Sequence, residues 1–254
     1  MAPRSLLHSV LASLVVVFVA ASVHAQRPSL APTPPMSWNS CDSYGTTVTE
    51  SQVEANADAM ARGHDYQPGA RLAMDDSGRL LPAPNKFPSA AGGTGFKSLA
   101  DYVHAKGLKF GIHVMRGIPR QAVSANAPIP GKTYHARDVA DTPNGCRWNR
   151  DRWGVDVSKP GGQAYYDAIA RLYASWGVDF VKADDMGDHN FQPSEISAQR
   201  RALDKTGRPI VLSISPGPAP LGQATFFAEN AQLWRISDDF ARRPTLRVTS
   251  SAPS

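Results

Sequence analysis

Cysteine is scarce in this chain, and its scarcity limits how the fold can be cross-linked. Cys41 and Cys146 are the two cysteines among 254 residues, so at most one intramolecular disulfide can form. A small disulfide-stabilised scaffold is therefore excluded. Hydrophobic residues make up 42% of the chain, which excludes a disordered polypeptide and allows one large domain, or two small ones, with a sizeable core.

Excess positive charge is small in the body of the chain, even though the net charge is +5. Arg4 lies near the N-terminus, and Arg242, Arg243 and Arg247 lie in the last fourteen residues. Without these four residues the net charge is +1, so the composition gives no support for a nucleic-acid partner. Neither a Gly-x-Gly-x-x-Gly motif after a strand nor a Walker loop occurs, which counts against nucleotide-binding folds.

Long apolar runs are confined to the N-terminus. The run over residues 6–21 follows a basic residue and precedes a small-x-small sequence that ends at Ala25. This pattern predicts a secretory signal peptide over residues 1–25 and a mature protein that begins at Gln26 and works in the periplasm or outside the cell. An interruption at His8 counts against the alternative, a membrane anchor. We expect no membrane partner after cleavage.

Helical periodicities alternate with short apolar runs along the rest of the chain. The expected helix and strand pairs are 96–107 with 108–113, 160–177 with 178–184, and 194–207 with 209–215, followed by a strand over 233–236. Ser194 is the expected cap of the third helix. This order predicts a parallel α/β fold, and the lack of nucleotide motifs favours a (β/α)8 barrel. The segment 117–157 is too long for a simple loop and is expected to lie over the active-site face.

Polar residues close the predicted strands at their carboxyl ends. They are His113, Asp184, Ser215 and Asp239. In a barrel, ligands bind at this edge of the strands. Lys182 precedes Asp184 by two residues and faces the same side of the strand, so its charge favours the ionised carboxylate. One ionised and one protonated carboxyl group on two strands suit glycoside hydrolysis, which needs a nucleophile and a proton donor.

Other interpretations of these acidic residues remain open. Aspartates after strands also cap helices or lie in solvated loops. Asp184, Asp185, Asp188 and His189 could form a site for a hard metal ion, but all four belong to one loop and no second segment contributes. We therefore expect neither a metal nor a cofactor. The mixed-charge run over residues 150–152 is expected to form solvated surface.

Four segments of the sequence resemble motifs of one enzyme family. They are TPPMSWNS at 33–40, LADYVHAKGLKFGI at 99–112, WGVDFVKAD at 176–184 and WRISDD at 234–239. All four occur in the family's order, and on them the chain resembles the α-galactosidases (melibiases) of glycoside hydrolase family 27. The resemblance implies a (β/α)8 barrel and a retaining hydrolase that cleaves terminal α-linked galactose from galactose-containing oligosaccharides or polysaccharides.

The resemblance also implies roles for individual residues. Asp184 matches the nucleophile that forms a covalent glycosyl-enzyme. Asp239 matches the acid/base, and it is preferred to Asp238 because it lies four residues after Arg235, which is the family spacing. The residues implied in substrate binding are Trp38, His113, Lys182, Ser215 and Arg235.

Two of these positions depart from the family pattern. His113 stands where many members carry Tyr, and Ser215 stands where Glu or Cys commonly binds the 2-hydroxyl group. A sugar with the galactose ring stereochemistry, such as β-L-arabinopyranose, is therefore an alternative to α-linked galactose. The family also often has a disulfide between a cysteine near Cys146 and the position two residues after the nucleophile. That position is Met186, so this disulfide cannot form.

Larger departures concern completeness. The second barrel strand and its carboxylate are missing near residues 60–66, and after Phe240 a basic Ser/Thr/Pro-rich tail replaces further barrel units. Counting a first strand around residues 36–38, five barrel strands are recognisable, and we expect an incomplete barrel. The expected organisation is a signal peptide over 1–25, a partial catalytic domain over 26–240 and a disordered tail over 241–254. The alternative function is a non-catalytic remnant or a sugar-binding partial barrel.

Overall fold

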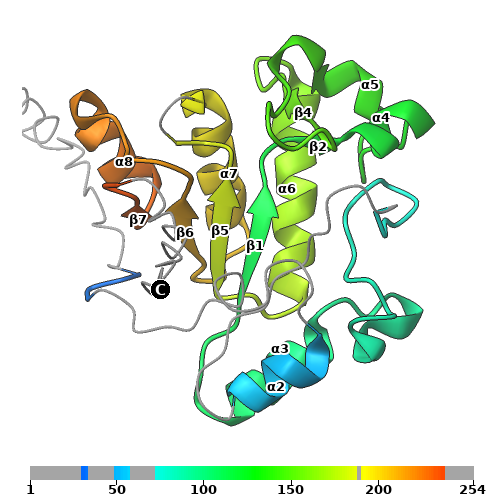
Figure 1. The fold of residues 1–254 in the computed structure, drawn as a ribbon. Coiled ribbons are helices and arrows are strands. Elements are labelled where there is room, and N and C mark those ends of the chain that lie inside the picture. The colour runs from blue at the N-terminus through cyan, green and yellow to red at the C-terminus, as the bar shows by residue number, and fades with distance from the viewer. Residues whose placement is uncertain (1–29, 34–48, 58–71, 188–189, 238–254) are drawn as a thin grey trace, which may run out of the picture.

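The central feature of the fold is a four-stranded parallel sheet. The structure is a computed structural model, and it describes residues 30–33, 49–57, 72–187 and 190–237. The strand order is β1-β5-β6-β7, with β1 at Gly111–Met115, β5 at Phe180–Asp184, β6 at Val211–Ile214 and β7 at Leu233–Trp234. Figure 1 shows these strands running in the same direction. They are four of the five predicted strands, and the one expected around residues 36–38 lies outside the described residues.

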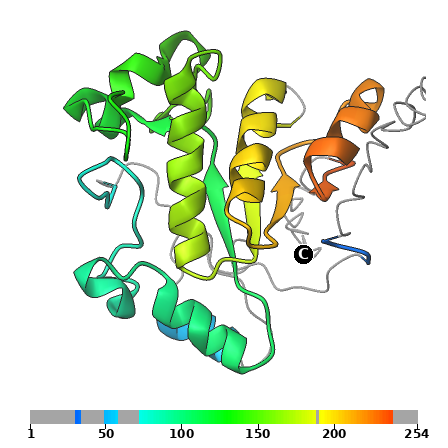
Figure 2. The same cartoon turned by 180° about the vertical axis from the view of Figure 1, so that it is seen from behind.

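Three helices cover one face of this sheet. They are α6 (Pro160–Ser175), α7 (Pro193–Lys205) and α8 (Ala224–Asn230), which lie in front of the sheet in Figure 2. Five of the strand residues that alternate onto this face are apolar and at most 4% exposed: Ile112, Val181, Ala183, Leu212 and Ile214. Burial of this apolar layer holds the helices against the sheet and leaves the other face for polar residues.

The helix boundaries follow the predicted periodicity, with one correction. Helices α3 (Lys97–Ala105) and α6 occupy two of the expected ranges. Helix α7 begins at Pro193, and its N-cap residue is Gln192, so the predicted cap at Ser194 is wrong. Proline suits the first helical turn because it lacks an N–H group that would have no partner there. Ser194 therefore lies inside the first turn.

Asp179 joins several elements just before the amino end of β5. Its carboxylate lies 2.7 Å from Nε2 of His104 on α3 and accepts a 2.6 Å bond from Arg208 and a 3.0 Å bond from the Phe110 N–H group. In Figure 1, α3 and α2 (Glu50–Ala57) lie beyond this end of the sheet. This end is thus held by charged contacts that are remote from the carboxyl edge.

The segment between β1 and α6 folds into a small unit of its own. It contains α4 (Arg120–Ala125), α5 (Ala136–Val139) and three short strands, β2 (Ile118–Pro119), β3 (Ala140–Asp141) and β4 (Arg152–Val155), in the antiparallel order β2-β4-β3. In Figure 1 this unit lies beyond the carboxyl end of β1. The expectation that residues 150–152 form solvated surface is wrong for Arg152, which begins β4 and is 4% exposed.

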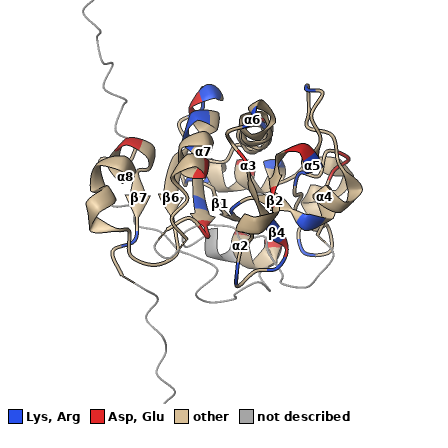
Figure 3. Ribbon diagram, turned by 90° about the horizontal axis from the view of Figure 1, so that it is seen from above, with Lys and Arg blue, Asp and Glu red and all other residues tan. Residues whose placement is uncertain are grey.

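Charge is distributed over the described elements without a one-sided patch. Figure 3 shows basic and acidic residues interspersed across the helices and strands. None of the helices in the described part of the chain has the length and apolar character needed to cross a bilayer.

Candidate active site at the carboxyl edge of the sheet

Strand register brings three predicted site residues together on the face opposite the helices. His113 on β1 pairs with Lys182 on β5, which pairs in turn with Ser213 on β6. One pleat further on, Met115 pairs with Asp184. Because side chains alternate along a strand, His113, Lys182 and Asp184 share a face, whereas the apolar residues between them pack against the helices.

Asp184 is held by hydrogen bonds at the end of β5. Its Oδ2 atom lies 3.1 Å from Nε2 of His113, and its Oδ1 atom accepts a 2.9 Å bond from the backbone N–H of Asp185. Burial opposes ionisation of the Asp184 carboxyl group. That effect is outweighed by the hydrogen bond to His113, the charge of His113, the hydrogen bond from the Asp185 N–H and the charge of Lys182. Together they lower the pKa of Asp184 below its ordinary value. The carboxylate is therefore ionised at neutral pH.

Two polar groups near Asp184 keep their hydrogen-bonding capacity. Among the described residues, no hydrogen bond or ion pair is made by the Lys182 ammonium or by the Ser215 hydroxyl. Ser215 directly follows β6 and is 2% exposed, and its N–H donates a 2.9 Å bond to the carbonyl oxygen of Ala183. Buried or half-buried donors without protein partners are available to the hydroxyl groups of a ligand.

The loop that follows Asp184 has a constrained backbone. Asp185 adopts a left-handed conformation with φ of 64°, which is uncommon for a residue other than glycine. The N–H groups of Met186 and Gly187 both donate to the carbonyl oxygen of Ser215, at 3.0 and 3.3 Å. These contacts tie the ends of β5 and β6 together, so the loop fixes the direction of the Asp184 carboxylate.

A buried charge network supports this loop, and sequence reasoning missed it. Arg116, which directly follows β1 and is 1% exposed, donates from Nε to Asp185 Oδ2 at 3.0 Å and from Nη1 to Glu195 Oε1 at 2.6 Å. Its Nη2 donates to the carbonyl oxygen of Asn144 at 3.0 Å. The hydroxyl of Tyr166 on α6 donates to the other carboxylate oxygen of Glu195. The network thus joins β1, the loop after β5, α6 and α7.

The pKa shifts in this network follow from burial and pairing. Burial lowers the pKa of Arg116, but Glu195 and Asp185 outweigh it and hold that pKa above its ordinary value. Burial raises the pKa of Glu195, although Arg116 and Tyr166 oppose it. Burial also raises the pKa of the Cys146 thiol, to about 11, so this buried cysteine is protonated at neutral pH.

Several predicted site residues are not placed. Trp38, Asp239 and the metal candidates Asp188 and His189 lie outside the described residues, as does Cys41. Arg235 follows β7 and is half-buried, and its carbonyl oxygen accepts a 2.8 Å bond from Ala219. Within the described ranges, no three His, Cys, Asp or Glu side chains gather in a way that could hold a metal ion. The structure therefore assembles His113, Lys182, Asp184 and Ser215 near the carboxyl edge of adjoining strands. Asp184 ends β5 and Ser215 follows β6, but the expectation that His113 closes its strand is wrong, because β1 runs on to Met115.

Comparison with known proteins identifies relatives of this arrangement. A melibiase family model described as alpha galactosidase A matches residues 70–159 and 154–242. Alpha-galactosidase A of Cellvibrio japonicus is 35% identical over 220 residues, which are 80% of this chain and 43% of that protein. The chain thus spans about half the length, or less, of the curated relatives it matches.

Solved structures of glycosidases also resemble this chain, and it covers about half of each of them. A GH27 β-L-arabinopyranosidase from Geobacillus stearothermophilus is 52% identical with a TM-score of 0.80, over 83% of this chain and 54% of that one. Alpha-galactosidase I from Mortierella vinacea is 25% identical with a TM-score of 0.57, over 84% of this chain and 47% of that one. These neighbours are (β/α)8 barrels, and the few parallel strands with their helices match part of one, which confirms the predicted fold class. The chain belongs to the melibiase family, glycoside hydrolase family 27.

Proposed function

We propose that the chain is a retaining glycoside hydrolase with Asp184 as its nucleophile. One observation carries the proposal: a buried carboxylate is kept ionised at the carboxyl end of β5, beside a Lys182 ammonium and a Ser215 hydroxyl that no described residue engages. A sugar ring placed against Asp184 would supply the hydroxyl groups that these donors need. The backbone N–H and His113 leave the carboxylate charged and fixed in direction, as a nucleophile requires.

In the proposed reaction, Asp184 attacks the anomeric carbon and the bond to the leaving group breaks. Asp239 donates a proton to the departing oxygen, then takes a proton from the water that hydrolyses the covalent glycosyl-enzyme. Lys182 and Arg235 bind ring hydroxyls, and Trp38 forms a wall for the sugar. The roles of Asp239 and Trp38 rest on their match to the family motifs.

The proposed substrate is a terminal β-L-arabinopyranoside, with the α-D-galactopyranoside as the related alternative. The relative that is 52% identical is a β-L-arabinopyranosidase, and the α-galactosidases described above are 25 to 35% identical. The two sugars share their ring stereochemistry and differ by one hydroxymethyl group. The positions of His113 and Ser215, which depart from the α-galactosidase pattern, support the same preference.

The test compares nitrophenyl β-L-arabinopyranoside with nitrophenyl α-D-galactopyranoside on the purified chain. We expect turnover that is faster with the first substrate, a product that first forms with retained anomeric configuration by NMR, and loss of turnover in Asp184→Asn. Turnover that persists in Asp184→Asn would overturn the nucleophile assignment. A rise in melting temperature with either free sugar and no turnover would support the alternative, a sugar-binding partial barrel.

We also propose that the chain is exported. The support is the basic residue, apolar run and small-x-small sequence within residues 1–25. N-terminal sequencing of the secreted or periplasmic fraction should give a first residue at Gln26. Retention of the full-length chain in the cytoplasm would contradict the proposal.

A further inference from the structure

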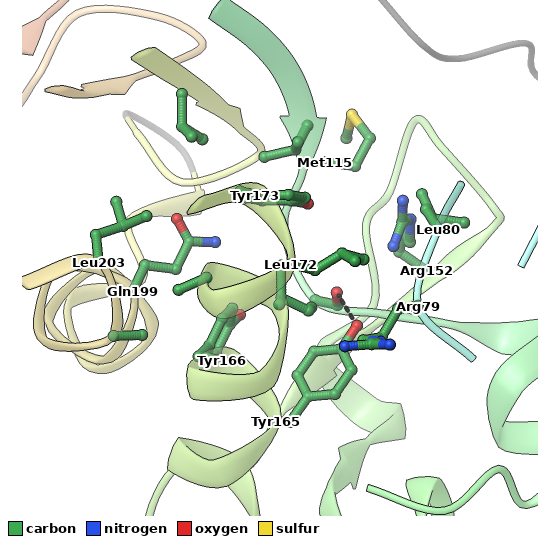
Figure 4. A pocket seen from close by; sticks show the side chains of 16 residues that line it. Arg79, Leu80, Met115, Arg152, Tyr165, Tyr166, Leu172, Tyr173, Gln199 and Leu203 are labelled. Atoms are coloured by element: carbon green, nitrogen blue, oxygen red, sulfur yellow. Dashed lines mark hydrogen bonds between the residues drawn. The ribbon is translucent and has the colours of Figure 1, made fainter. Parts of the chain in front are cut away.

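A small, partly open cavity lies on the helix-covered face of the sheet, opposite the face that carries Asp184. Its volume is about 30 Å³, and its walls include Val114 and Val181 from the sheet, Leu172 from α6 and Leu203 from α7. Figure 4 shows the side chains that line it. A space of this size holds one or two water molecules or one small ion, but no organic ligand.

The charged residues that line this cavity are all positively charged. Two of the sixteen lining residues are charged, Arg79 and Arg152, and no aspartate or glutamate is among them. In Figure 4 both arginines lie on the same side of the lining residues, Arg79 beside Tyr165 and Arg152 beside Leu80. The hydroxyl of Tyr165 donates to the carbonyl oxygen of Gly117 at 3.2 Å, and burial raises its pKa, so it is uncharged and neutralises neither cation.

The two arginines differ in how they are paired. Arg79 is bound by Asp75, with Nε and Nη2 each 2.7 Å from Oδ2. Arg152 is 4% exposed, its Nε is buried without a hydrogen-bond partner, and no carboxylate of the described residues pairs with its guanidinium. By contrast, the equally buried guanidinium of Arg116 is bound by Asp185, Glu195 and a carbonyl oxygen.

A buried guanidinium N–H without a hydrogen-bond partner is unfavourable, because burial removes its hydration and no described residue replaces it. A partner for this group must fit in about 30 Å³ beside Arg152, and a negatively charged partner would offset the charge as well as accept the hydrogen bond. We propose that this cavity binds a small monovalent inorganic anion, such as chloride, through the guanidinium of Arg152. The ion would lie between β1, β4 and α6 and would stabilise their packing. This site is independent of the proposed hydrolysis.

The first test compares melting temperatures in sodium chloride and in sodium methanesulfonate at equal ionic strength, which cancels general screening by salt. Methanesulfonate is too large for the cavity. We expect chloride to raise the melting temperature of the wild type by about 2–4 °C. Arg152→Met should abolish this difference, whereas Arg171→Met, which removes an exposed arginine from α6, should retain it. Equal melting temperatures in both salts would overturn the proposal.

The second test uses the wild-type chain, so it tests the anion site even if Arg152→Met fails to fold. Crystals of the wild-type chain are grown or soaked in bromide, and anomalous diffraction is measured. A bromide peak in the cavity within hydrogen-bonding distance of the Arg152 guanidinium supports the anion site. Density for water alone, or no density in the cavity, overturns it.

Discussion

Nε2 of His113 lies 3.1 Å from Oδ2 of Asp184, so a hydrogen bond crosses from β1 to the carboxylate at the end of β5. The same carboxylate receives the Asp185 N–H on its other oxygen. Asp184 is thus positioned both by its own loop and by the neighbouring strand. Since both bonds favour the charged form, they set the lower pH limit of any reaction that needs Asp184 as an anion.

Replacing His113 should therefore move that limit. In His113→Phe the carboxylate loses its partner, the pKa of Asp184 rises, and the acidic limb of the kcat/KM profile moves to higher pH. The lowered pKa of the wild-type Asp184 also stabilises the fold above the unfolded-state pKa, and this contribution is lost as pH falls through the folded-state pKa. His113→Phe should lose that contribution to the free energy of unfolding at neutral pH.

His104 offers a matched control for this experiment. It also pairs with an aspartate, at 2.7 Å from Asp179, but near the amino end of the strands. His104→Phe should lower the free energy of unfolding and leave the acidic limb where it is. A similar movement of the limb in both variants would show that the limb reports general stability and not the His113 bond.

Arg116→Met should be among the most destabilising substitutions in the described part of the chain. It leaves Asp185 and Glu195 buried without their counterion, which typically costs about 3–5 kcal/mol of unfolding free energy. The pKa of Glu195, already raised by burial, should rise further without Arg116. A group with a raised folded-state pKa stabilises below its unfolded-state pKa, and this contribution is lost as pH rises through the folded-state value.

The loss in Arg116→Met should therefore be smaller at acid pH than at neutral pH, as measured by urea unfolding. The double variant Arg116→Met, Glu195→Leu should recover part of the loss, because it removes one of the unpaired charges. A loss that does not change with pH, and that adds to the loss in Glu195→Leu, would contradict the coupling of the two residues.

Gly187→Ala tests the loop after Asp184. A Cβ atom on Gly187 would lie 2.5 Å from the carbonyl oxygen of Pro216, so the backbone must shift, at a cost of about 1–3 kcal/mol. The shift should also turn Asp184 and lower kcat more than it raises KM. Gly222→Ala is the control, since no atom lies within 4 Å of its added Cβ, and it should change neither stability nor activity appreciably. Equal behaviour of the two variants would refute a positioning role for this loop.

Lys182→Met should separate binding from folding. The ammonium makes no hydrogen bond or ion pair with a described residue, so its removal should change the free energy of unfolding little. A hydrogen bond from a charged group to a sugar hydroxyl contributes about 1.5–3 kcal/mol, so kcat/KM should fall by about 10- to 150-fold. Steady-state kinetics with urea unfolding of the same samples checks both expectations. A large loss of stability with unchanged kcat/KM would show that Lys182 is structural.

The elements could be predicted where the pattern is local. Apolar spacing within 160–177 and the apolar run of 178–184 suffice to place α6 and β5, because each buries one continuous apolar side. The same reasoning put Asp184 at the end of its strand, which is confirmed, and put His113 there too, although His113 lies in the middle of β1. Their mutual hydrogen bond depends on register between two strands that are 71 residues apart at these positions, which no local pattern fixes.

The supporting network was missed for the same reason. Arg116 and Glu195 are 79 residues apart and come from a strand end and the first turn of a helix, where charged residues usually face solvent. No local pattern in the sequence marked Arg116 as buried, and its burial between Met115 and Gly117 is seen only in the structure. Charge alone also failed for Arg152, since a mixed-charge run does not reveal that its last member begins a buried strand.

The alternation of side chains along β5 has a consequence for how the chain tolerates change in length. Lys182 and Asp184 face away from the helices, and Val181 and Ala183 face them, with β1 and β6 on either side. Deleting one residue ahead of Lys182 would reverse every position of the strand and drive an ammonium and a carboxylate into the apolar layer under α6 and α7. Loss of a residue from the exposed Gly131–Lys132 turn would leave that alternation intact. Natural length variation should therefore accumulate in such turns and be absent from β5.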